Sequence, residues 1–88
     1  MMNIRQDATR QIEQAKMLHR QGRLAEAMAT YGALLARDPR WFEPHYLLAL
    51  ANYQQGNAAE ACRLISGALE LKPHAVEAHA LLAGACSC

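Results

Sequence analysis

Hydrophobic residues recur along this chain at the spacing of helices. Apolar side chains three and four positions apart occupy two successive segments in the first part of the sequence, and Gly22 separates them. The same pattern resumes after Pro39 and again after Pro73. Spacings of three and four place side chains on one face of an α-helix. The pattern therefore predicts an all-α chain of about five helices.

Glycine and proline mark where the predicted helices end. Gly22 and Gly56 each separate two apolar segments, and a glycine in that position favours a turn between helices. Proline disfavours helix in the residue before it, so the second and fourth helices are expected to end before Pro39 and Pro73. The last three helices are expected over 41–55, 57–71 and about 75–85.

The chain also repeats itself. The segment Gly22–Ala27 (GRLAEA) recurs 34 residues later as Gly56–Ala61 (GNAAEA), and Pro39 recurs as Pro73 at the same offset. A period in this range is typical of repeat arrays, whose units contact only their neighbours and together form an extended concave surface. We therefore predict one domain over 1–88, with repeats at 8–41 and 42–75 and the first helix of a third at 76–88.

Small residues occupy equivalent positions of the repeat. Two positions hold only alanine, and these are Ala15, Ala49 and Ala83 in one case and Ala27 and Ala61 in the other. Alanine lets two helix axes approach closely, whereas a larger side chain pushes them apart. Tyr31 and Ile65 come four residues after the second pair, and we expect them to fill the gap between one unit and the next.

The composition fits a small helical domain without a strongly charged surface. Hydrophobic residues make up 52% of the 88 residues, which excludes intrinsic disorder on composition. The net charge of +1 provides no strong field to attract nucleic acid or an anionic membrane. No apolar run approaches the roughly 20 residues of a membrane span, and no secretion signal is evident. We therefore predict a cytoplasmic location, with neither nucleic acid nor membrane as partner.

The three cysteines do not predict a disulfide framework. They are odd in number, and Cys86 and Cys88 crowd at the end of the sequence. Cys62 is expected to be a small buried hydrophobe. The other two are expected to belong to a frayed terminus rather than to a metal or redox site.

No constellation of catalytic or cofactor-binding residues stands out. The sequence has no glycine-rich phosphate loop and no nucleophile elbow, and Ser66 has no general base nearby in sequence. His45 and His79 repeat at 34 residues, but neither has a second ligand three or four positions away, as a helical zinc site requires. We expect no enzyme activity, no cofactor and no metal site.

These positions resemble the tetratricopeptide repeat family. Its 34-residue helix–turn–helix unit has a small residue in the first helix, an alanine and then a larger residue in the second, and a closing proline. The matching residues are Ala15, Ala27, Tyr31 and Pro39, followed by Ala49, Ala61, Ile65 and Pro73. The chain departs from the family where a tryptophan is frequent, since Gln11, His45 and His79 occupy that position. The resemblance implies an α-solenoid of antiparallel helix pairs in a right-handed superhelical stack.

By this resemblance, the first helix of each unit lines a concave groove that binds a partner. The groove residues it implies are Ile12, Lys16, Tyr46, Leu47, Leu50 and Tyr53. One branch of the family holds a C-terminal carboxylate with basic residues, but at the equivalent positions only Lys16 is basic and Glu77 has the wrong sign. An apolar groove better suits a hydrophobic helix or an extended segment. The first hypothesis is therefore a non-catalytic protein–protein interaction scaffold.

Two alternatives follow from the last segment, Ala78–Cys86, which is nearly all apolar or small. Repeat arrays generally need a terminal element with a polar outer face, and this segment does not provide one. In one alternative the chain self-associates as a homodimer or larger homo-oligomer through Leu81 and Leu82. In the other it is the N-terminal arm of a longer enzyme, such as a transferase.

Overall fold

The computed structural model describes residues 4–85, and their secondary structure is entirely α-helical. The helices are α1 (Ile4–Arg20), α2 (Leu24–Arg37), α3 (Phe42–Gln54), α4 (Ala58–Leu71) and α5 (Val76–Ala85). The last three lie within one residue of the limits that the sequence predicts. The all-α helical repeat fold is therefore confirmed.

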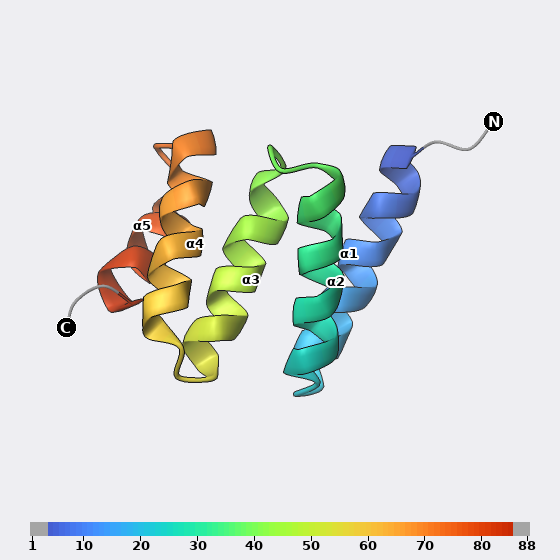
Figure 1. Ribbon diagram of the computed structural model, residues 1–88, viewed down its shortest axis with the longest axis horizontal. Helices are drawn as coiled ribbons and strands as arrows, with labels where there is room; N and C mark the ends of the chain where they lie inside the picture. Colours follow the sequence, from blue (N-terminus) through green and yellow to red (C-terminus); the bar gives the residue numbers. More distant parts are fainter. Residues whose placement is uncertain (1–3, 86–88) are drawn as a thin grey trace.

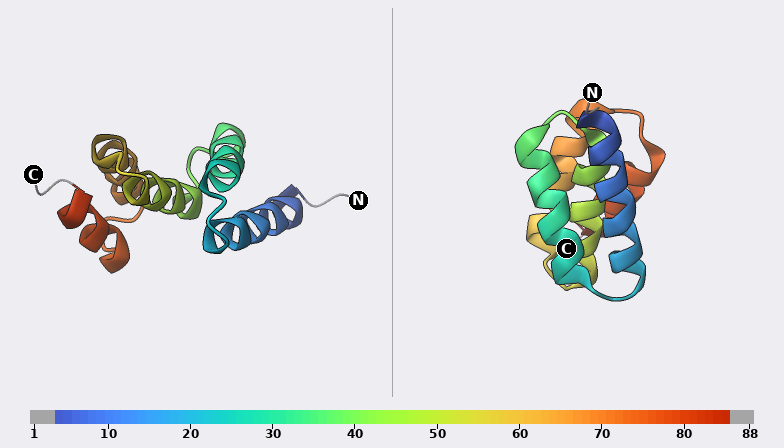
Figure 2. Two further views of the ribbon diagram at one scale, coloured as in Figure 1. Left: turned by 90° about the horizontal axis from the view of Figure 1, so that it is seen from below. Right: turned by 90° about the vertical axis from the view of Figure 1, so that its right-hand side faces the viewer.

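The helices stand side by side and alternate in direction from α1 to α5 (Figure 1). Each packs mainly against its neighbours in sequence, and α3 also touches α5. Seen along the helices, α2 and α4 lie on one side of the stack and α1 and α5 on the other, with α3 between them (Figure 2). The first helices of the pairs therefore share one face of the molecule.

Two glycines shape the turns inside the helix pairs. Gly22 and Gly56 have φ angles of 85° and 89°, in the left-handed region that other residues rarely adopt. After the first of them, the Arg23 amide donates a hydrogen bond to the Leu18 carbonyl at 2.9 Å, and the equivalent bond in the second turn is 2.8 Å long. This is the Schellman ending of a helix, which satisfies carbonyls that would otherwise lack partners. The two turns are the same because the sequence repeats there.

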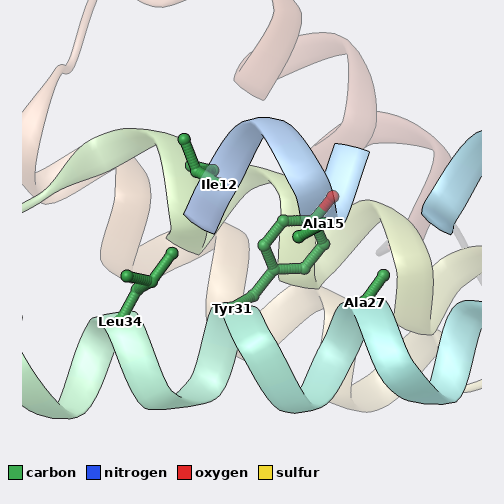
Figure 3. Packing of buried hydrophobic residues seen from close by; sticks show 5 residues of the cluster. All are labelled: Ile12, Ala15, Ala27, Tyr31 and Leu34. Carbon is green, nitrogen blue, oxygen red and sulfur yellow. The ribbon is translucent and has the colours of Figure 1, made fainter. Parts of the chain in front are cut away.

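The core of the first helix pair lies between α1 and α2 (Figure 3). From α2, the side chains of Ala27, Tyr31 and Leu34 point toward α1, where Ile12 and Ala15 meet them. All five are at most 1% exposed. Each alanine leaves room for the larger side chains beside it, as the repeat pattern predicts.

A second core joins α3, α4 and α5. It contains Ala49, Ile65, Ala68, Ala78 and Leu81. Ala49 and Ile65 occupy the positions of Ala15 and Tyr31 in the first core, and both are fully buried. Ala83, the third alanine of that position, is exposed on α5. Equivalent residues are thus buried only where a following helix covers them.

Cys62 differs from the expectation. It is half-buried in α4 and disulfide-bonded, so its assignment as a simple buried hydrophobe is wrong. Cys86 and Cys88, expected to form a frayed terminus, lie outside the described residues. Disulfides are rare in cytosolic proteins. The bond therefore gives no support to the cytoplasmic location, which stays a prediction.

Within residues 4–85, no helix has the length and apolar character needed to cross a membrane.

Candidate functional site

The face shared by α1, α3 and α5 is hollowed. One hollow encloses about 770 Å³ between Lys16 of α1, Tyr46 and Leu47 of α3, and Glu77 of α5. A second, of about 450 Å³, lies toward the other end of α3 and shares Lys16 and Leu47 with the first. The two are therefore continuous, and together we call them the groove.

The structure distributes the six expected groove residues unevenly. Four of them line the groove, namely Lys16, Tyr46, Leu47 and Leu50. Ile12 lies in the core with 1% of its surface exposed, so its assignment to the groove is wrong. Tyr53 is 41% exposed and its hydroxyl approaches Gly84 of α5, outside the residues that line the two hollows.

An aromatic pair forms one wall of the groove. The rings of Phe42 and Tyr46 lie parallel, with centroids 6.1 Å apart and planes 10° from each other. Lys72 Nζ lies 5.0 Å from the centroid of the Phe42 ring, which places a cation over its face. Burial raises the pKa of the Tyr46 hydroxyl, and the charge of Glu77 adds to the rise. This end of the groove therefore has apolar and aromatic surface for a partner to cover.

An ion pair crosses the groove between α1 and α3. Lys16 Nζ donates a hydrogen bond to Glu43 Oε1 at 2.8 Å, and Glu13 Oε1 lies 3.5 Å from the same atom. The bond to Glu43 is the main reason that the pKa of Lys16 is raised, against the opposing effect of partial burial. Because its charge is already paired, Lys16 is poorly placed to hold the carboxylate of a partner.

His19 closes the other end of the groove. Its Nε2 lies 2.5 Å from Gln54 Oε1, and its Nδ1 lies 3.4 Å from the Tyr31 hydroxyl. The imidazole thus connects α1 with α2 and α3 at once. These two contacts hold α1, α2 and α3 together at the end of the groove away from Phe42.

His45 and His79, the residues with a possible metal-binding pattern, have a structural role. His45 Nε2 donates to the Pro39 carbonyl at 2.8 Å, and His79 Nε2 donates to the Pro73 carbonyl at 2.6 Å. A carbonyl only accepts, so the Nε2 atoms carry the hydrogen. The two bonds fasten the loops that precede α3 and α5 in the same way. Among the described residues, no three His, Cys, Asp or Glu side chains come together as metal ligands.

The surface expected to self-associate is partly buried. Leu81 is 8% exposed and lies in the second core, and Leu82 packs partly buried against it. The assignment of Leu81 to an outer surface is therefore wrong. The outward-facing apolar residues of α5 are Val76, Ala80 and Ala83, and Val76 is 78% exposed.

Sequence reasoning missed the groove residues that come from the connections between repeats. Arg40, Trp41 and Phe42 follow the closing proline of the first unit, and Lys72 precedes that of the second. They lie at or beside the helix ends, where too few periodic positions are present to assign a side chain to a face. Their position beside the repeated prolines is the signal that could have found them.

Comparison with known proteins supports the repeat assignment. A family model described as TPR repeat matches residues 15–56, which run from the middle of α1 to the turn after α3. No curated protein matches the chain. Repeats of this family generally mediate protein–protein interaction and are not catalytic. The tetratricopeptide resemblance drawn from the sequence is thereby confirmed, and residues 15–56 are a tetratricopeptide repeat segment within the stack of helices.

Proposed function

We propose that this chain is a non-catalytic scaffold that binds a peptide or a helix of a partner protein in the groove of α1, α3 and α5. The observation that carries the proposal is the open groove itself, with Tyr46 and Leu47 in its walls. Extended segments and amphipathic helices bind in long apolar grooves of this kind. The repeat units of the scaffold are taken as 8–41, 42–75 and 76–88.

The apolar groove residues are suited to be anchors because their burial is incomplete. Tyr46, Leu47 and Leu50 are each partly buried against the cores. A partner that covers the rest of their surface gains roughly 25 cal/mol for each Å² of apolar area removed from water. The side chains are already held by packing, so little rotamer entropy is lost when the partner binds.

The test is a selection of random peptides displayed on phage against the full 88-residue chain. Selected peptides are then titrated by fluorescence anisotropy. Leu47→Gln should weaken their binding by about tenfold, because a central apolar anchor is removed. Met17→Gln is the matched control: Met17 is 60% exposed on α1 and lines neither hollow, and affinity should stay within about twofold.

Two results would overturn the proposal. One is a selection that yields no peptide with saturable binding. The other is unchanged affinity in a Leu47→Gln chain whose circular dichroism shows intact helices. Amide chemical shifts of the unaltered chain provide a measurement that does not depend on a variant folding. On adding peptide, the shifts should change along α1, α3 and α5, and changes confined to α2 and α4 would contradict the groove.

Self-association through α5 is a second candidate function. Its exposed Ala80 and Ala83 stand at the positions of Tyr46 and Ala49, which in the second repeat are half-buried and fully buried. A second copy of the chain would cover the same face of α5. Light scattering over a dilution series should then show a dimer, and Ala83→Glu should convert it to a monomer. A parent chain that is monomeric at every concentration would exclude this candidate.

A further inference from the structure

A third hollow, of about 420 Å³, extends the groove beyond the loop between α2 and α3. It lies between Thr9 of α1, Arg37 at the end of α2, and the loop residues Asp38, Arg40 and Trp41. Arg40 and Trp41 line both this hollow and the larger part of the groove. A chain that lies in the groove can therefore continue over these two side chains into the third hollow, which we call the arginine hollow.

The two arginines of this hollow have no ion-pair partner in the part of the chain that the structure describes. Arg37 and Arg40 are both exposed, and neither guanidinium forms an ion pair within residues 4–85. Lys16 in the groove, in contrast, is paired with Glu43. The acid of the hollow is Asp38, whose Oδ1 accepts a hydrogen bond from the backbone amide of Arg40 at 3.2 Å. The hollow therefore has two cations and one anion.

The residues that line the groove and the arginine hollow together also carry an excess of positive charge. Although the chain has a net charge of only +1, five of its nine Lys and Arg residues line the three hollows, against three of its eight Asp and Glu residues. The cations are Lys16, Arg20, Arg37, Arg40 and Lys72, and the anions are Asp38, Glu43 and Glu77. Charge complementarity across an interface therefore favours a partner segment with an excess of acidic residues.

We propose that the arginine hollow binds acidic side chains of the partner segment whose apolar residues occupy the groove, an inference that rests on the proposed function. Guanidinium groups pair with carboxylates through two parallel hydrogen bonds, so Arg37 and Arg40 suit Asp or Glu side chains. The half-buried indole of Trp41 offers an apolar face between them and the groove. The partner is thus an extended segment in which acidic residues lie close to an aliphatic or aromatic one.

Peptide chemistry fits this surface better than nucleic acid does. Asp38, Glu43 and Glu77 interrupt the basic residues along the three hollows. Nucleic-acid binding depends on a dense series of phosphate contacts. A continuous phosphate backbone along the hollows would therefore pass close to these carboxylates, and the like charges would repel each other. A peptide can place its few carboxylates at Arg37 and Arg40 alone.

The peptide selection tests this inference when it is run in parallel on the full chain and on the R37Q/R40Q chain. Peptides selected by the parent chain should be enriched in Asp and Glu beside an apolar residue. R37Q/R40Q should bind them about tenfold more weakly at low salt, and the difference should shrink at about 0.5 M NaCl, as expected for exposed charges. R10Q/R23Q removes the same charge outside the three hollows and should bind as the parent chain does.

The outcomes separate this inference from the function on which it rests. If the selected peptides lack acidic enrichment, or bind both double variants equally, while Leu47→Gln still weakens binding, the arginine hollow is not the subsite and the groove stands. If no peptide binds the parent chain, the groove itself is refuted. If a single-stranded oligonucleotide binds more tightly than the peptides and R37Q/R40Q abolishes this, the hollow recognises nucleic acid and the inference is wrong.

Discussion

The two ends of the helix stack have opposite chemistry. On α1, Arg10 and Gln14 are exposed, although Pro44 and Leu48 at the same positions of the second repeat are buried and half-buried. On α5, Ala83 keeps the alanine that this position has in the first two repeats, but it is exposed. Polar residues thus replace apolar ones at the first end but not at the last.

The repeat period therefore sets which type of residue occupies a position, whereas the neighbouring helix sets whether its side chain is buried. The α1 end is suited to face water because its exposed positions are polar. The α5 end retains the surface that an inner helix presents to its partner. Comparison of equivalent residues at the two ends therefore measures what a covering helix contributes.

The largest expected difference is between Ala15→Leu and Ala83→Leu. Ala15 is fully buried between α1 and α2, so added methylene groups should destabilise the fold by about 2–3 kcal/mol through overpacking. Ala83 is exposed and leucine is a good helix former, so the cost there should be below about 0.5 kcal/mol. Urea unfolding of both variants measures the difference. An equal loss at Ala83 would show that the face of α5 is covered in solution.

The next largest effect is a pH dependence from the Tyr31 position, to which the equivalent residue of the second repeat should not contribute. Burial raises the pKa of Tyr31 to about 12, and the charge of Glu43 adds to the rise. The second repeat has Ile65 at this position and nothing to ionise. Above pH 10 the unfolded chain loses the tyrosine proton while the folded chain keeps it. This contribution to stability is therefore complete below about pH 10 and decreases as the pH rises toward 12, by about 1.4 kcal/mol per unit.

Urea unfolding at several pH values between 9 and 11.5 compares the parent chain with Tyr31→Phe. The difference in unfolding free energy between them should be constant below about pH 10 and change by up to about 2 kcal/mol above it. Parallel curves for the two chains across the whole range would show that the phenol is not buried as described.

The smallest effect concerns the histidines that fasten the loops. His45→Ala and His79→Ala each remove a hydrogen bond to a proline carbonyl and should cost about 1 kcal/mol. Gln11 holds the same position in α1 and is exposed, so Gln11→Ala should change stability by only a few tenths of a kcal/mol. Thermal unfolding of the three variants checks the order. If His45→Ala lowers stability and His79→Ala does not, the hydrogen bond from His79 to Pro73 does not hold the loop before α5 in solution.

The candidate site was only partly predictable from the sequence. Periodicity and the family resemblance point to Leu47 and Leu50, because they lie on the face of α3 that continues from one repeat to the next. Ile12 satisfies the same spacing but lies in the core, because α1 turns this residue toward Tyr31 of α2. Arg40 and Trp41 lie in a connection, where no period exists to assign a face.

By itself, the sequence determined the all-α fold, the helix limits and the equivalence of the repeats. These follow from local rules: apolar spacing, left-handed glycines at Gly22 and Gly56, and prolines that stop helices. Only the tertiary structure decided that Leu81 is buried, that Lys16 is paired with Glu43, and that Arg37 and Arg40 lie exposed beside the groove without an ion pair among residues 4–85. Burial and pairing depend on which helix lies opposite, and this is a property of the packed stack rather than of any single segment.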